Sequence, residues 1–285
     1  MKHCKLSVLE TGTFALDGGA MFGVVPKVLW QNLLPLDDIN RVTLHLRCLL
    51  VQVDGKNILI DTGIGSKSSE KFSHMFHIDH SQHSLRTSLA KHQLTEDDIT
   101  HVILTHLHFD HAGGATKKNK SGEIVPTFKN AKYYVQKKNY DWATHPKEKD
   151  KASYLGENFL SLQAHNQLHF LEGEQELFEG IRLKCFHGHT AGQQLPLITL
   201  GQQSYFFCAD LIPTSAHISL PWIMAYDNEP LKTLEEKRTL LAEAVQNKWI
   251  LIFEHCPLLQ AARVEHTEKG FALTEKMAKL DTQEV

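Results

Sequence analysis

One short segment constrains this chain more than any other, residues 105–114 with the sequence THLHFDHAGG. It follows the apolar run HVILT at 101–105, which predicts a short buried strand. In a helix His106 and Asp110 would share a face and His108 would point away, whereas a tight loop lets these side chains and His111 converge on one point. Imidazole nitrogens and carboxylate oxygens are ligands of Zn²⁺ and related ions. The segment therefore predicts a metal site rather than a polar surface loop.

Other apolar runs also end in polar residues that could reach the same site. Residues 48–60 predict a hairpin around Asp54-Gly55, and its second strand leads into Asp61. Predicted strands at 204–209 and 249–253 are followed by Asp210 and, one residue further, by His255. Since strand followed by polar loop recurs along the chain, one face of a layered α/β structure could gather these loops.

The rest of the pattern predicts one α/β domain over residues 1–285. Helices are expected at 84–94 and 231–247, with a further helix start at 95–98. A polar, lysine-rich stretch around 137–172 predicts a helical excursion. Further strands are expected at three places, namely 131–136, 181–186 and 195–200. No linker rich in Gly, Ser or Pro divides the sequence.

Composition excludes several classes of function. The net charge is -3 and no basic run is present, so neither nucleic acid nor a membrane surface is expected as a partner. The N-terminus lacks the apolar segment of a secretory signal, and no apolar stretch is long enough to span a bilayer, which predicts a cytoplasmic protein. The five cysteines are scattered and predict neither disulfides nor a thiolate zinc site. Histidines outside the motifs, including the run 74–83, are interpreted as a solvated segment or as ordinary side chains.

The string HLHFDH resembles the HxHxDH signature of the metallo-β-lactamase superfamily. The family's other motifs follow in the expected order between residues 58 and 255, including DTG at 61–63 and GHTAG at 188–192. This resemblance implies an αββα sandwich with the site at one edge of two sheets. It implies two divalent metal ions, expected to be Zn²⁺. The implied ligands of the two ions are His106, His108 and His189 for one, Asp110, His111 and His255 for the other, and Asp210 as the bridge.

The resemblance also implies the reaction. Two metals that share a water hold a hydroxide ready near neutral pH and polarise a carbonyl or phosphoryl oxygen. Asp110 and Asp210 are the implied catalytic carboxylates, with Asp110 able to carry a proton to the leaving oxygen. Asp61 is expected behind the metal ligands, where it would orient one of them or its loop. The predicted chemistry is hydrolysis of an ester-like bond in a small molecule.

Two stretches favour a lactone as that molecule. HLHFDHAGG, which contains Phe109, is similar to the N-acyl-homoserine lactonases, and DGGAMFGVVPKVLW at 17–30 resembles quorum-quenching lactonases of the YtnP-like branch. Met21, Phe22 and Phe109 are therefore predicted to contact the substrate. His217, outside these stretches, is also predicted to contact it. Alternatively, residues 17–30 pack into the core or join two copies in a homodimer.

Other readings remain open at this point. Some lactonases carry a substrate-polarising tyrosine shortly after the bridging aspartate, and residues 211–217 contain none; Thr214, His217 or Tyr226 could replace it. An organophosphate hydrolase shares nearly the same metal set. A glyoxalase II-like thioesterase needs a C-terminal helical domain, for which the thirty residues after His255 are too few. A ligand sensor on the same fold would use the motifs without catalysis.

Overall fold

The computed structural model describes residues 4–284, and contacts divide the chain into two compact units. Unit 1 comprises Met1–Thr13, Leu46–Gly173 and Thr282–Val285, and unit 2 comprises Phe14–His45 and Glu174–Asp281. The boundary falls inside two long strands, β1 (Lys5–Asp17) and β2 (Arg41–Val53). The single domain over 1–285 stays a prediction.

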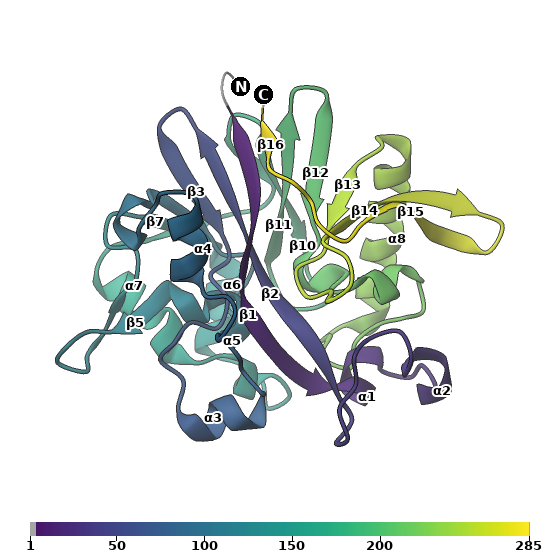
Figure 1. Ribbon diagram of the computed structural model, residues 1–285, viewed down its shortest axis with the longest axis horizontal. Helices are drawn as coiled ribbons and strands as arrows, with labels where there is room; N and C mark the ends of the chain where they lie inside the picture. The colour runs from purple at the N-terminus through teal and green to yellow at the C-terminus, as the bar shows by residue number, and fades with distance from the viewer. Residues whose placement is uncertain (1–3, 285) are drawn as a thin grey trace. The chain divides into compact units, whose positions relative to one another are not determined.

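Unit 1 is built around a seven-stranded mixed sheet with the order β16-β1-β2-β3-β4-β7-β8 (Figure 1). Strands β3, β4, β7 and β8 run parallel to one another. Strand β2 pairs antiparallel with β3, and β16 pairs antiparallel with β1. Besides β1 and β2, its strands are β3 (Lys56–Ile60), β4 (His101–Ile103), β7 (Lys132–Gln136), β8 (Leu168–Leu171) and β16 (Gln283–Glu284). A separate hairpin pairs β5 (Thr116–Lys118) with β6 (Ile124–Pro126).

The helices of unit 1 are short. They are α3 (Glu70–Met75), α4 (Leu85–Lys91), α5 (Phe109–Ala112), α6 (Lys137–Thr144) and α7 (Leu160–Ala164), with 3-10 turns η1 (Glu96–Asp98), η2 (Gly113–Ala115), η3 (Lys151–Ser153) and η4 (Gly156–Asn158). Residues 137–172 thus hold α6, α7 and two 3-10 turns before the chain returns as β8. The predicted helix at 84–94 is confirmed as α4, where Ser84 and Thr87 form a capping box. The helix start expected at 95–98 is only the single turn η1.

The predicted hairpin at 48–60 is confirmed. Asp54 and Gly55 have φ values of 48° and 71° between β2 and β3, as a tight hairpin turn requires. Leu59 on β3, Val102 on β4 and Tyr133 on β7 have no exposed surface and share one core cluster. This rigid sheet carries the loops that follow β3 and β4.

Unit 2 contains a second seven-stranded mixed sheet with the order β15-β14-β13-β12-β11-β10-β9. Its strands are β9 (Gln175–Phe178), β10 (Ile181–Phe186), β11 (Gln193–Leu200), β12 (Gln203–Phe207), β13 (Ile250–Ile252), β14 (Ala261–Thr267) and β15 (Gly270–Met277). Figure 1 shows β14 and β15 as one long hairpin, which the sequence analysis missed. The strand expected at 204–209 ends earlier, and Asp210 lies in the 3-10 turn η5 (Ala209–Leu211).

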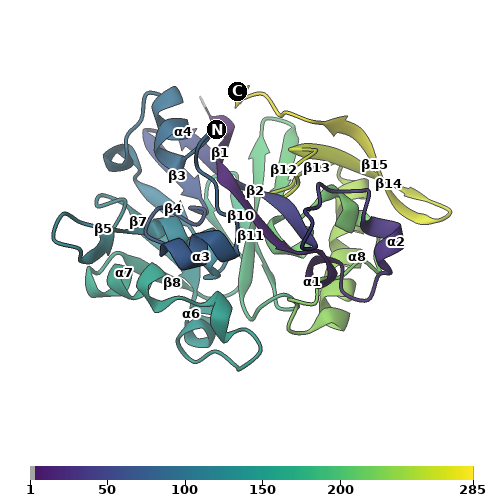
Figure 2. The ribbon, with the colours of Figure 1, turned by 60° about the horizontal axis from the view of Figure 1, so that its bottom comes forward.

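Three helices and a second 3-10 turn complete unit 2, namely α1 (Gly18–Phe22), α2 (Lys27–Trp30), α8 (Pro230–Gln246) and η6 (Ser215–Ile218). The predicted helix at 231–247 is confirmed as α8, with Pro230 in its first turn. Residues 17–30 hold α1, which follows directly after β1, and then α2 (Figure 2). The side chain of Asp17 caps α1 by accepting from the backbone N–H of Ala20.

Disulfides and membrane-spanning helices can be looked for in residues 4–284. Within that range the five cysteines form no disulfide with one another. In that same range no helix has both the length and the apolar character needed to cross a bilayer.

Candidate metal centre

The predicted ligands form two groups, one within each unit. In unit 1, β4 delivers the chain into residues 104–108, and the one-turn helix α5 follows at 109–112. His106, His108, Asp110 and His111 are all buried. Nε2 of His106 lies 3.0 Å from Nδ1 of His108, and Nε2 of His111 lies 3.5 Å from a carboxylate oxygen of Asp110. His106 lies outside any helix or strand and His108 has an extended backbone, whereas Asp110 and His111 lie on the helical turn α5.

Asp61 holds this group from behind. It accepts from the backbone N–H and from the hydroxyl of Thr105, each at 2.7 Å, and lies 3.1 Å from Nδ1 of His111. Its φ of 56° is left-handed, a conformation that few residues other than glycine adopt. Because Asp61 engages one ring nitrogen of His111, the other nitrogen is directed toward Asp110. This contact is compatible with the orienting role that the sequence assigned to Asp61, and that role stays a prediction.

Unit 2 brings together His189, Asp210 and His255. Oδ2 of Asp210 lies 3.1 Å from Nε2 of His189, and Oδ1 lies 3.0 Å from Nε2 of His255. The two oxygens of one carboxylate therefore face two different imidazoles. On the far side of each ring, Nδ1 of His189 lies 2.7 Å from Asp227 and Nδ1 of His255 lies 2.8 Å from the carbonyl of His45.

The donor atoms within each group fit metal ligation. Two ligand atoms bound tetrahedrally to one Zn²⁺ at about 2.0–2.2 Å are separated by about 3.3–3.5 Å, close to the 3.0–3.5 Å separations found in both groups. The electrostatics agree. Burial lowers the pKa of His189, but Asp210 and Asp227 outweigh this and raise the pKa to about 9. The two carboxylates thus favour a positive charge at this ring, which a bound cation would supply.

Asp227 is a partner of the group that sequence reasoning missed. It is 3% exposed and lies 38 residues from His189, in an irregular segment without a motif. Histidines that bind metals usually donate their second N–H to such a carboxylate or to a carbonyl. That general rule was the only available signal, and it does not say which aspartate takes the role.

His217 and Phe22, both predicted to contact substrate, pack inside unit 2. The Phe22 ring is fully buried and stacks on the His217 ring at a centroid distance of 4.9 Å. His217 is hydrogen-bonded through Nδ1 to the Thr214 hydroxyl and through Nε2 to the carbonyl of Met21. Burial lowers the pKa of His217 to about 4, so the ring is neutral and fastens α1 to η6. Their contact with substrate stays a prediction.

Phe109 has aromatic neighbours that the sequence analysis did not identify. Its ring centroid lies 5.2 Å from that of Phe72 and 4.9 Å from that of Phe76, both of which are half-buried on and just after α3. The ring of Tyr154 lies 4.6 Å from that of His108. Phe72 precedes, and Phe76 lies within, the histidine-rich run 74–83 that was interpreted as solvated. Only their spacing of four residues hinted at a shared apolar face.

Comparison with known proteins identifies the family of the chain. The model of the Metallo-beta-lactamase superfamily matches residues 47–246, and the chain belongs to that superfamily. The sequence-based family assignment and fold class are thereby confirmed.

Curated sequences that are similar to this chain are named N-acyl homoserine lactonases. One from Bacillus thuringiensis is 35% identical over 98 residues, which cover 34% of this chain and 32% of the relative. One from Bacillus cereus is 27% identical over 169 residues, covering 56% of this chain and 60% of the relative. The chain therefore matches between about a third and three fifths of the length of these relatives.

Solved structures match over nearly the whole chain. A structure described as a "probable metal-dependent hydrolase" from Staphylococcus aureus has a TM-score of 0.87 and 31% identity, covering 98% of this chain and 97% of that one. The dizinc quorum-quenching lactonase AidC, in complex with the product N-hexnoyl-L-homoserine, has a TM-score of 0.76 at 21% identity and covers 95% of this chain and 94% of that one. At that identity the second match supports the fold alone.

Proposed function

We propose that the protein is a metal-dependent hydrolase that opens a lactone, of the N-acyl-homoserine lactone kind. The observation that carries the proposal is the Asp210 carboxylate, whose two oxygens face His189 and His255 at 3.1 and 3.0 Å. One carboxylate between two imidazoles is the arrangement that a metal-bridging ligand requires. Neither group of ligands suffices alone for two four-coordinate ions, so we assign both groups to one dinuclear centre.

The proposed ligands are His106, His108 and His189 for one ion and Asp110, His111 and His255 for the other, bridged by Asp210. Two divalent cations, with Zn²⁺ proposed for this nitrogen-rich set, would activate a water and polarise the ester carbonyl. Asp61 and Asp227 fix the ring orientations of His111 and His189, so that these ligands lose little freedom on binding. We assign to Asp110 the role of carrying a proton to the leaving alkoxide oxygen.

The substrate class is supported by two features. The curated relatives named above are named lactonases. The buried ring of Phe109, inside the ligand segment, forms an apolar cluster with the half-buried rings of Phe72 and Phe76. Such a cluster suits an acyl chain, because each buried CH₂ contributes about 0.8 kcal/mol. We propose a small-molecule lactone with an apolar acyl chain as the substrate, and the cytoplasm as its place of action.

The test combines metal analysis with a substrate panel. Protein from metal-replete growth should hold close to two metals per chain. The Asp210→Ala protein should hold less metal. Its activity should fall by more than the about 10–100-fold that is typical when a residue hydrogen-bonded to a metal ligand is replaced. Asp38→Ala, at an exposed aspartate outside both groups, is the matched control and should retain both. One metal per chain, or an Asp210→Ala protein with full activity, would contradict the dinuclear scheme.

The panel should contain acyl-homoserine lactones, thioesters and phosphotriesters. The lactone proposal requires the highest kcat/KM on the lactones. Faster turnover of a phosphotriester or thioester would overturn the substrate class and leave the hydrolase standing. Two bound metals with no turnover of any class would instead indicate a ligand sensor.

A further inference from the structure

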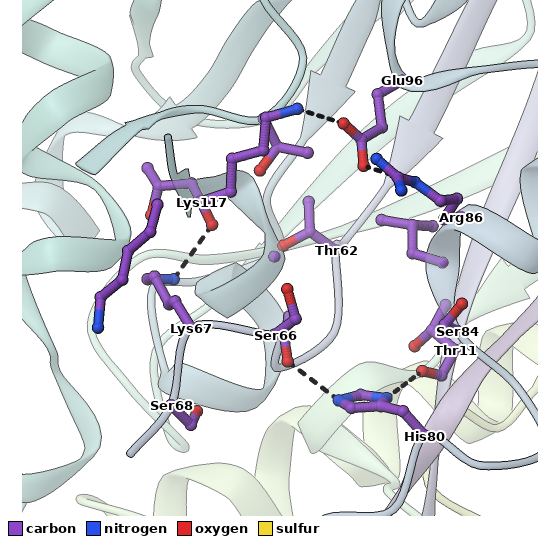
Figure 3. Close-up of a pocket in the computed structure, with 16 residues that line it drawn as sticks. Thr11, Thr62, Ser66, Lys67, Ser68, His80, Ser84, Arg86, Glu96 and Lys117 are labelled. Atoms are coloured by element: carbon purple, nitrogen blue, oxygen red, sulfur yellow. Dashed lines mark hydrogen bonds and ion pairs between the residues drawn. The ribbon is translucent and has the colours of Figure 1, made fainter. Parts of the chain in front are cut away.

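Unit 1 contains a cavity of about 610 Å³ that the proposed hydrolysis does not use (Figure 3). Its wall comes from β1, the segment after the DTG motif, α4, η1, η2 and the β5–β6 hairpin. None of the proposed metal ligands lines it. Seven of its lining residues carry a hydroxyl group and four carry a cationic side chain, with Glu96 as the one carboxylate.

The positive charge of this cavity is only partly compensated. Figure 3 shows Glu96 between Lys117 and Arg86, and it is ion-paired with both. Lys67 and Lys118 line the cavity without a carboxylate partner among its lining residues. A cavity that gathers more cations than anions is suited to a negatively charged ligand.

Lys67 is the central cation. It is only 7% exposed, and its ammonium group donates to the carbonyls of Gly113 and Thr116. An ammonium has three donors, so these two partners leave one for a ligand. Burial lowers the pKa of Lys67 to about 8, a shift that Glu157 opposes and Lys118 reinforces. An anion placed between Lys67 and Lys118 would relieve that repulsion.

Hydroxyl groups complete the set of donors. Within residues 4–284 the Thr127 hydroxyl is buried and makes no hydrogen bond, although it lines the cavity and the residue is only 7% exposed. A buried hydroxyl of this kind normally has a partner. Ser66 and Ser68 flank Lys67 on the same segment (Figure 3).

The rim of the cavity is held in place by hydrogen bonds between its segments. The ring nitrogens of His80 lie 2.9 Å from the carbonyl of Thr11 and 3.0 Å from that of Gly65, which fastens the 61–68 segment to β1. A side chain at Gly12 would meet the His80 ring at 2.5 Å. The donors therefore lie on a fixed framework, which reduces the cost of ordering them around a ligand.

From these observations we infer that the cavity binds a small phosphorylated molecule, whose phosphate is held by Lys67, Lys118 and the Thr127 hydroxyl. A phosphate group offers three oxygens and almost two negative charges, which matches several hydroxyl donors and two cations better than a carboxylate does. The volume beyond the phosphate accommodates a small organic body. This site is separate from the proposed hydrolysis and does not depend on it.

The test is calorimetric titration of the metal-loaded protein with inorganic phosphate, with ribose 5-phosphate and with acetate. Both phosphates should bind saturably with a Kd of about 1 mM or tighter, and acetate should not. Thr127→Val and Lys118→Gln should each weaken binding about five- to tenfold. Lys120→Gln removes an exposed lysine two residues along the same hairpin, outside the cavity, and should leave Kd unchanged.

The variants also separate this site from phosphate bound at the metals. Because the Thr127 hydroxyl has no partner within the described chain, Thr127→Val should not lower the melting temperature. Equal phosphate affinity in all four proteins would place binding elsewhere and overturn the inference. Absence of saturable phosphate binding would overturn it too, and acetate binding as tight as phosphate would overturn the phosphate class.

Discussion

Oδ1 of Asp227 lies 2.7 Å from Nδ1 of His189, on the side of the ring opposite Asp210. This contact fixes the imidazole so that Nε2 is presented to Asp210. Asp227→Asn keeps the shape and removes the charge. We expect metal affinity to fall about 10–100-fold, measured by competition with a chromophoric chelator. Asp38→Asn is the control, and equal affinity in both variants would show that Asp227 does not support the ligand.

Phe22→Ala should destabilise the protein by about 3–5 kcal/mol, because the fully buried ring stacks on Trp30 and His217 and leaves a cavity. Val24→Ala, at a side chain that is 95% exposed, should change stability by less than about 0.5 kcal/mol. Urea unfolding measures both.

Kinetics of the same Phe22→Ala protein test the sequence-based hypothesis for residues 17–30. That hypothesis requires KM to rise more for long-chain than for short-chain acyl lactones. A loss of stability with equal kinetic effects on all chain lengths would assign Phe22 to packing alone.

Phe72→Ala should alter chain-length preference. If the cluster of Phe72, Phe76 and Phe109 contacts the acyl chain, kcat/KM should fall about tenfold more for a long-chain lactone than for a short one. Phe170→Ala, at a ring on β8 that is 36% exposed, provides the control. A loss independent of chain length would remove the cluster from the substrate pocket.

Lys237 predicts a pH dependence of stability. It is fully buried, donates to the carbonyls of His217, Ser219 and Trp222, and burial lowers its pKa to about 7 although Asp227 opposes the shift. Between pH 7 and the ordinary lysine value of 10.5 the unfolded chain binds a proton that the folded chain does not. Its contribution to stability is therefore complete above the unfolded pKa and is lost as the pH falls toward 7.

We accordingly expect the free energy of unfolding to rise between pH 7 and 9 by on the order of 2 kcal/mol more in the natural protein than in Lys237→Met. Lys232→Met, at the same helix, should retain the slope of the natural protein. Chemical unfolding at constant ionic strength gives these slopes, and identical slopes in all three proteins would contradict the assignment to Lys237.

Local signals predicted the elements that deliver the ligands. A few neighbouring residues encode each of three signals, namely the Asp54-Gly55 turn, the apolar run before His106, and Pro230 at the start of α8. The β14–β15 hairpin was missed because it mixes exposed polar residues such as Glu265 with buried ones and has no turn motif of its own.

Long-range partnerships could not be predicted in the same way. Asp227 resembles any other aspartate until the fold brings it to His189, and nothing around Lys67 in the sequence signals its burial. Phe72, just before a histidine-rich run, was missed because a half-buried ring on a short helix leaves little periodicity to detect. The motifs thus pointed to candidate ligands, whereas the residues that contact those candidates could be found only in the tertiary structure.

The left-handed backbone at Asp61 has a consequence for mutational tolerance. Glycine would adopt its φ of 56° most easily, but it would leave the N–H of Thr105 and the ring of His111 without the acceptor that the carboxylate provides. Larger acceptors such as glutamate would disfavour this left-handed backbone conformation, because among residues with a side chain mainly asparagine and aspartate adopt it. In a saturation library position 61 should therefore admit aspartate, asparagine to a lesser degree, and almost nothing else.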